Sequence, residues 1–225
     1  MVQGGGRSAG SPPASRSEQA AQRIRDLIGS GVFRPGEHLN EARLSADLDV
    51  SRNTLREAYR ILTHEGLIQY ETNKGVRVTV PSRASMTDLY RVRRLVEVNI
   101  LRNAGPDHPA ARRMRTAVTR AYAARDQQDW LGVGTANLDF HRSVIALADS
   151  PRLERLNELI WVELRLVFGI IDDPRVLHAP YIEMNDTIVG AYEAGQPERA
   201  AQLLEEYLLH SEGTMLAAYG RVSDP

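Results

Sequence analysis

The sequence predicts a mainly α-helical protein, with an N-terminal winged helix-turn-helix (α-helices with a small β wing) followed by an all-α helical bundle. Residues 51–66 combine an apolar stripe at helical spacing with a basic opposite face. Residues 67–80 alternate on both sides of a Thr-Asn-Lys-Gly turn, which is typical of a β-hairpin. Beyond residue 85 the apolar positions recur at helical spacing with no strand signal, so this half is expected to be all-α.

Length and composition fit this organisation. The chain has 225 residues, enough for two small domains, and its 42% hydrophobic and 25% charged content is ordinary for a globular protein. No apolar run approaches the roughly 20 residues of a membrane-spanning helix, and no signal peptide is evident. The chain has no cysteine, which excludes disulfides and thiolate metal sites and fits a cytoplasmic protein. A net charge of −1 leaves room for a local basic surface.

Composition shifts divide the chain into parts. Residues 1–16 are rich in Gly, Ser and Pro and are expected to form a disordered N-terminal arm. Residues 17–80 form the predicted winged helix-turn-helix, residues 81–85 a linker, and residues 86–220 the helical domain. Ser85, with Asp88 three residues later, resembles a capping box and marks the start of that second domain.

The N-terminal elements follow from apolar spacing and caps. From Glu18 onward a first helix is expected, with Ala21, Ile24, Leu27 and Ile28 on its inner face. Asn40 can then cap a short helix that buries Leu44 and Leu48, and a tight turn at residues 48–50 leads directly into Ser51. Two helices joined in this way make a helix-turn-helix, whose second helix enters the DNA major groove.

The second helix of this motif, residues 51–66, carries the strongest functional signal. Ser51 is its expected N-cap, Gly66 ends it, and its inner stripe consists of Leu55, Ala58, Tyr59 and Leu62. Its opposite face carries Arg52, Asn53, Arg56 and Arg60. Guanidinium groups at the start of a short helix suit phosphate oxygens and guanine edges. The alternative, for an isolated helix, is a solvated basic face. At the hairpin tip stands Lys74, the only lysine in the chain, beside Gly75.

In the second half, apolar stripes predict successive helices. These stripes are Leu89, Val92, Val96 and Ile100; Met114, Val118 and Ala121; Phe140, Val144 and Leu147; and Leu153, Leu156, Ile160 and Val167. Ser150-Pro151 is expected to open the last of these. An irregular stretch is predicted at residues 172–180, followed by helices over 181–194 and 197–219 separated by Gly195.

The run P-G-E-H-L-N-E-A-R-L-S-A-D-L-D-V-S-R-N-T-L-R-E-A-Y-R-I-L-T-H-E-G-L-I, within residues 20–80, resembles the DNA-binding domain of GntR-family bacterial transcription regulators. The resemblance implies DNA contacts from the first helix of the motif, from its second helix and from the wing tip. Together with the helix start and its basic face, this gives the candidate DNA-binding residues Arg43, Ser51, Arg52, Asn53, Thr54, Arg56, Lys74 and Gly75. Asn53 departs from the small residue or Thr common at its position.

Residues 86–219 resemble the FCD effector domain of the FadR-like GntR subfamily, through L-Y-R-V-R-R-L-V-E, N-L-D-F-H-R-S-V, A-Y-E-A-G-Q-P-E-R-A-A and E-E-Y-L-L-H-S. Many members hold a divalent metal with one Asp and three His. The matching positions here are Asn137, His141, Asn185 and Tyr207, so only His141 is retained. Amides and a phenol are weak ligands for a Zn-like ion. We therefore expect no cofactor and a hydrogen-bonding pocket for a small organic effector; any metal would be held by His141 with Asn137.

Arg93 matches an arginine that the resemblance places beside the same cavity. A guanidinium there can bind an acidic effector bidentately, which makes a carboxylate a candidate ligand. The alternative is an ion pair with Glu97, one helical turn away. The candidate effector-binding residues are Arg93, Asn137, His141, Asn185 and Tyr207.

The resulting functional prediction is a DNA-binding transcription regulator, and in this family most often a repressor. We expect it to bind a palindromic double-stranded operator as a homodimer, because one recognition helix reads only a half-site. A small molecule in the helical domain would modulate that binding. The alternative from another class is a metal-dependent enzyme using His141, although no Ser-His-Asp set, phosphate loop or paired-histidine motif is present. A third interpretation is an architectural DNA-binding protein that has no effector.

Overall fold

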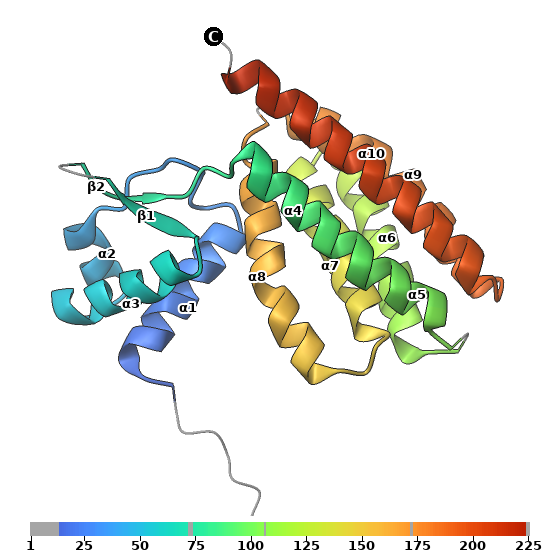
Figure 1. The fold of residues 1–225 in the computed structure, drawn as a ribbon, viewed down its shortest axis with the longest axis horizontal. Coiled ribbons are helices and arrows are strands. Elements are labelled where there is room, and N and C mark those ends of the chain that lie inside the picture. The colour runs from blue at the N-terminus through green and yellow to red at the C-terminus, as the bar shows by residue number, and fades with distance from the viewer. Residues whose placement is uncertain (1–13, 72–73, 106, 172, 224–225) are drawn as a thin grey trace, which may run out of the picture.

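The computed structural model describes residues 14–71, 74–105, 107–171 and 173–223. The fold is mainly helical with one two-stranded antiparallel sheet, which confirms the predicted fold class (Figure 1). Most of the predicted arm, residues 1–13, lies outside the described residues. The elements are α1 (Arg16–Gly29), α2 (Glu41–Asp47), α3 (Arg52–His64), β1 (Ile68–Glu71), β2 (Gly75–Val78), α4 (Arg83–Arg93), the π-helix η1 (Arg94–Val98), α5 (Asn99–Asn103), α6 (Pro109–Asp126), α7 (Trp130–Ala146), α8 (Pro151–Phe168), α9 (Pro174–Glu193) and α10 (Pro197–Ser223).

The N-terminal part is a winged helix-turn-helix. The Asn40 side chain accepts a hydrogen bond from the Arg43 amide at 2.9 Å and begins α2, and Ser51 begins α3 in the same way. Asp49, in the turn between them, has a φ of 53°. β1 and β2 pair with Ile68 opposite Val78, and both side chains enter the core beneath α3. The caps and inner stripe predicted for α2 and α3 are therefore observed.

α1 begins earlier than predicted, at Arg16. Ser15 caps it, because its hydroxyl accepts a hydrogen bond from the Glu18 amide at 3.2 Å while the Glu18 carboxylate accepts one from the Ser15 amide at 2.6 Å. Arg16 is therefore helical, and its assignment to a disordered arm was wrong.

The link between the two parts is also shorter than predicted. Ser82, and not Ser85, is the N-cap of α4, and its hydroxyl accepts a hydrogen bond from the Ser85 amide at 3.1 Å. Because α4 begins at Arg83, the predicted linker of residues 81–85 is wrong and only residues 79–82 separate β2 from α4.

The C-terminal part is a helical bundle. α7 is buried between α6, α8 and α9, while α10 packs along α9 and against α4 and α5 (Figure 1). The irregular stretch predicted at residues 172–180 is wrong from residue 174 onward, since α9 begins at Pro174 and contains Pro180. Pro180 removes one backbone donor, but burial of Leu177, His178 and Tyr181 offsets that loss. Within the described residues no helix is long and apolar enough to span a bilayer.

The first helix of the bundle consists of α4, η1 and α5 in succession. The apolar spacing did not predict the π-helical interruption η1. A π-turn inserts one extra residue per turn and shifts the direction of the side chains that follow. Here it contains Glu97, which is completely buried.

α8 connects the two parts. Its Val162 and Leu166 are buried in the core of the N-terminal part, next to α1, while Trp161, Leu164 and Val167 are buried in the bundle core. A second link is polar. Arg165 Nε donates to the Gly29 carbonyl at the end of α1 (3.0 Å), and its Nη2 donates to the Thr135 hydroxyl on α7 (2.9 Å).

We expect Leu166→Ala to lower the free energy of unfolding by about 2–5 kcal/mol, because it opens a cavity where the two parts meet. The matched control is Leu156→Ala on the same helix, whose side chain is 67% exposed. Its effect should stay within about 0.5 kcal/mol. Urea denaturation followed by circular dichroism measures both. A loss as small for Leu166→Ala as for the control would mean that the junction contributes little to stability.

Candidate functional site

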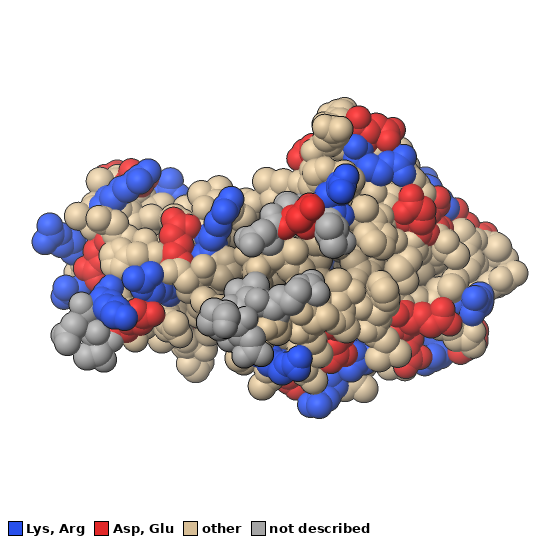
Figure 2. All heavy atoms as spheres, turned by 90° about the horizontal axis from the view of Figure 1, so that it is seen from above, with Lys and Arg blue, Asp and Glu red and all other residues tan. Residues whose placement is uncertain are grey.

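The exposed face of α3 presents basic side chains. Arg52 and Asn53 are exposed, and the Arg56 side chain is 64% exposed. Arg56 lies 3.8 Å from the Glu41 carboxylate, a loose pair that solvent screens. Seen from above, the end of the molecule that carries the winged helix-turn-helix shows several Lys and Arg side chains, with Asp and Glu among them (Figure 2). The predicted basic face is therefore present and free to meet phosphates or base edges.

Ser51 and Thr54 stand at the start of α3 and bond to each other. The Ser51 hydroxyl accepts a hydrogen bond from the Thr54 amide at 3.1 Å and lies 2.8 Å from the Thr54 hydroxyl. Ser51 is exposed and Thr54 is half-buried. Both residues fix the geometry of the helix start, where amide groups favour anions.

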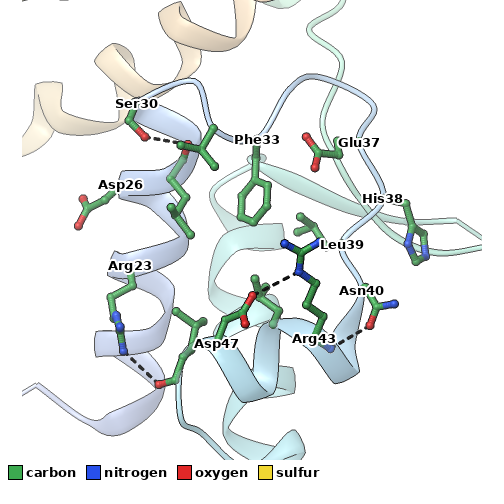
Figure 3. A pocket seen from close by; sticks show the side chains of 14 residues that line it. Arg23, Asp26, Ser30, Phe33, Glu37, His38, Leu39, Asn40, Arg43 and Asp47 are labelled. Carbon is green, nitrogen blue, oxygen red and sulfur yellow. Dashed lines mark hydrogen bonds and ion pairs between the residues drawn. The ribbon is translucent and has the colours of Figure 1, made fainter.

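Arg43 lies on α2, beside a groove of about 830 Å³ between α1, α2 and the loop that follows α1 (Figure 3). Its guanidinium is 3.5 Å from the Asp47 carboxylate and extends over the groove, near Phe33 and Leu39. The Arg43 side chain is nevertheless 83% exposed, so a change of rotamer can release it from Asp47.

At the wing, Lys74 is exposed and Gly75 has a φ of +84°. A Cβ on Gly75 would lie 2.8 Å from His38 Nε2, so both the backbone conformation and the close approach require glycine. His38 forms a β-bridge with Arg77 that adds a short third segment to the sheet, a contact that the sequence did not suggest. The tip residues Thr72 and Asn73 lie outside the described residues.

The effector-binding residues predicted in the bundle meet in one buried polar cluster. Arg93 Nε donates to Glu97 Oε1 at 2.7 Å, and Glu97 Oε2 lies 2.6 Å from His141 Nδ1. Asn185 Nδ2 and the Tyr207 hydroxyl both donate to Asn137 Oδ1, at 2.7 and 3.0 Å. The rings of His141 and Tyr207 lie 5.0 Å apart and join the two groups. The ion pair between Arg93 and Glu97, considered as an alternative from the sequence, is present.

The charges in the cluster balance within it. Burial alone would raise the pKa of the Glu97 carboxyl, but the Arg93 and His141 groups outweigh it and hold that pKa below its ordinary value. Burial lowers the pKa of His141 despite Glu97. His141 is therefore neutral near pH 7. Since a carboxylate only accepts hydrogen bonds, the proton of His141 is on Nδ1 and the lone pair is on Nε2.

Several polar atoms of the cluster are buried without a hydrogen-bond partner among the described residues. They are Arg93 Nη2, a donor; His141 Nε2 and Asn185 Oδ1, both acceptors; and the hydroxyl of Tyr181, whose ring lies 4.9 Å from that of Tyr207. Buried polar groups without a hydrogen-bond partner are energetically costly.

The donors do not fit a divalent metal. His141 offers the lone pair of Nε2 while Glu97 holds its Nδ1–H, the arrangement found in metal-binding histidines. However, Asn137 Oδ1 already accepts two hydrogen bonds. Burial also raises the pKa of Tyr207 well above its ordinary value and keeps the phenol neutral. Within the part of the chain that the structure describes, no group of three or more His, Cys, Asp and Glu could hold a metal ion.

Sequence reasoning missed two members of this cluster. Glu97 was considered only as a partner of Arg93, although it also holds His141. Tyr181 was not predicted to be a site residue. The sequence placed it at the start of a helix, whereas it lies inside α9, which begins at Pro174.

We expect Glu97→Gln to lower the free energy of unfolding by about 3–5 kcal/mol, because it leaves the Arg93 charge buried without a partner. The control is Glu193→Gln, which breaks a half-exposed pair with Arg115 and should cost about 1 kcal/mol or less. Thermal and chemical denaturation measure both. Equal losses for the two variants would show that the buried pair contributes no more to the free energy of unfolding than the half-exposed pair does.

Comparison with known proteins agrees with this geometry. Residues 16–78 match the model of the gntR family of bacterial regulatory proteins, and residues 88–210 match the FCD domain. The chain is 26% identical over 216 residues to a protein of Paenarthrobacter nicotinovorans named as a probable D-xylose utilization operon transcriptional repressor, covering 88% of this chain and 92% of the relative. It is 32% identical over 143 residues to the Nta operon transcriptional regulator of Aminobacter aminovorans, covering 58% and 67%.

A solved structure of a GntR transcriptional regulator from Rhodococcus sp. RHA1 is also similar. Its TM-score is 0.85 at 41% identity, over 92% of this chain and 100% of that one. The two family models together span both halves of the chain, in the order that the fold shows. The chain therefore belongs to the GntR family of bacterial transcription regulators, with a C-terminal FCD domain, and the resemblance drawn from its sequence is confirmed.

Proposed function

We propose that this regulator is a cytoplasmic repressor that binds a palindromic operator as a homodimer. The observation that carries the proposal is the exposed basic face at the start of α3, with Arg52 and Arg56 one turn apart and Lys74 on the wing. One such helix covers only a half-site, so two-fold symmetry supplies the remaining specificity. Xylose-operon and gluconate-operon relatives are named as repressors, which supports the direction of control.

The proposed effector is a small carboxylate with at least one hydroxyl or amine, bound in the buried polar cluster of the bundle. Arg93 Nη2 would donate to the carboxylate, and His141 Nε2 and Asn185 Oδ1 would accept from the other group. Asn137 and Tyr207 would position Asn185 and His141 through the contacts that they already make. No metal takes part, because the cluster supplies one imidazole nitrogen and otherwise weak or occupied donors.

A physical route connects this cluster to the DNA-binding part. α7 carries Asn137 and His141, and its Thr135 accepts the hydrogen bond from Arg165. Arg165 also holds the last carbonyl of α1. An effector that moves α7 would therefore change the position of α1 and of the α3 helix packed on it. The effector must bind the two arrangements with different affinity for this to alter operator binding.

The first test is DNA binding by the α3 arginines, using an operator selected from a random DNA library. Arg52→Ala and Arg56→Ala should each weaken operator binding by roughly 1–3 kcal/mol, or about 5- to 150-fold, if each makes a base contact. Arg91→Ala is the control, since Arg91 is an equally exposed arginine on α4. Fluorescence anisotropy measures all of them. An equal loss on random DNA would mean that these arginines contact only phosphates.

The second test concerns the metal. Elemental analysis of the purified protein should find no stoichiometric divalent ion, and a chelator should leave its melting temperature unchanged. The matched variant Asn137→Asp/Asn185→His/Tyr207→His restores the donors that the family resemblance implies. It should gain a stoichiometric ion and a melting temperature that falls with chelator. Stoichiometric metal in the unaltered protein would contradict the proposal and redirect the effector search to metal-chelating ligands.

A further inference from the structure

A cavity of about 180 Å³ lies where the two parts of the molecule meet. One wall comes from the loop after α1, through Gly31, Phe33, Arg34 and Pro35. The other comes from the bundle: Leu131 at the start of α7, the end of α8, and residues of α9. None of its lining residues belongs to the buried polar cluster described above, so the cavity is a separate site.

Arg165 lines this cavity as a buried cation that forms no ion pair with any residue the structure describes. Its exposure is 6%, and its hydrogen bonds go to the Gly29 carbonyl and the Thr135 hydroxyl, which are both neutral. No acidic side chain within the described ranges forms an ion pair with it. Burial accordingly lowers the pKa of this guanidinium. A buried charge without a partner is costly, and an anion in the adjacent cavity would remove that cost.

His178 lines the same cavity with an unpartnered atom. The residue is 4% exposed, and its Nδ1 is buried with no hydrogen-bond partner among the described residues. The ring is fixed on one side by Phe168, at 5.1 Å between centroids, and on another by α7, where a Cβ on Gly134 would lie 2.5 Å from Nε2. These two contacts restrict the imidazole.

Most of the other lining side chains are apolar: Phe33, Pro35, Leu131, Phe168, Ile171 and Leu177, with the exposed Arg34 as a second cation at the wall. A buried cation, an unpartnered imidazole and a mainly apolar lining together indicate the kind of ligand that fits: an anion with an apolar body. We propose that this junction cavity binds a small carboxylate with a compact apolar body, whose carboxylate pairs with Arg165 and hydrogen-bonds with His178. A cavity of about 150 Å³ accommodates benzene, so a ligand of benzoate size fits.

Such a ligand touches both parts of the molecule at once. It contacts the loop after α1 and the residue that joins α1 to α7. Binding therefore stabilises the present arrangement of the two parts relative to any arrangement in which the cavity opens. This gives the regulator a second small-molecule input, independent of the effector proposed for the bundle cluster.

Calorimetric titration of the full chain with benzoate and with its neutral analogue benzamide tests the charge. We expect benzoate to bind at least about tenfold more tightly than benzamide, since only benzoate offers Arg165 a charged partner. Equal affinity for the two, or no binding of benzoate at millimolar concentration, would overturn the proposal.

Two tryptophan variants test the position without altering Arg165 or His178. Leu131 is 56% exposed at the cavity edge, so Leu131→Trp should fold normally, fill the cavity and weaken benzoate binding at least about tenfold. Leu156→Trp, at a more exposed leucine outside the cavity, should bind as the unaltered protein does.

Tyr207→Phe separates this site from the cluster in the bundle. It removes a hydroxyl of the cluster and should leave benzoate binding unchanged. If Tyr207→Phe weakens binding while Leu131→Trp does not, benzoate occupies the bundle and the junction site is refuted, whereas the effector proposal stands.

Discussion

Helix α8 is a member of two hydrophobic cores. Val162 and Leu166 on one face are buried with α1, and Trp161, Leu164 and Val167 on the others are buried in the bundle. Because an α-helix is rigid over its 18 residues, these two sets of contacts cannot move independently. The DNA-binding part is therefore held to the bundle by packing as well as by residues 79–82. Arg165, between the two buried faces, adds hydrogen bonds to α1 and α7 at the same place.

Inside the bundle, the polar cluster depends on one local irregularity. The π-turn η1 holds Glu97 fully buried between Arg93 on its own helix and His141 on α7. Its carboxylate uses one oxygen for each partner, which keeps the guanidinium paired and fixes the tautomer of the imidazole. A polar network in a bundle core is tolerated when its charges are matched, as those of Arg93 and Glu97 are here.

The winged helix-turn-helix could be predicted because its signals are local. Asn40 and Ser51 cap the two helices, Gly66 takes the positive φ that ends α3, and the wing turn separates two alternating strands. The cluster in the bundle was located only through family resemblance, and its geometry could not be predicted. Glu97 and His141 are 44 positions apart in the sequence. They meet only because α7 packs on the helix that contains η1. The start of α9 was misjudged because burial of Leu177, His178 and Tyr181 outweighs the local effect of Pro180. The junction cavity had no sequence signal, since its walls come from four separate segments.

The energetic scale of regulation matches what these buried atoms can supply. A ligand changes the balance between two arrangements only by its difference in affinity for them. An unpartnered buried polar group costs about 1–3 kcal/mol, and the coupling free energies of allosteric proteins are typically 1–3 kcal/mol. One or two hydrogen bonds made in a single arrangement are therefore enough. His141 Nε2 and Asn185 Oδ1 in the bundle, and His178 Nδ1 at the junction, are groups of this kind. A ligand at either proposed place would act on α7 or on its contact with Arg165, so the two proposed inputs would converge on the same end of α1.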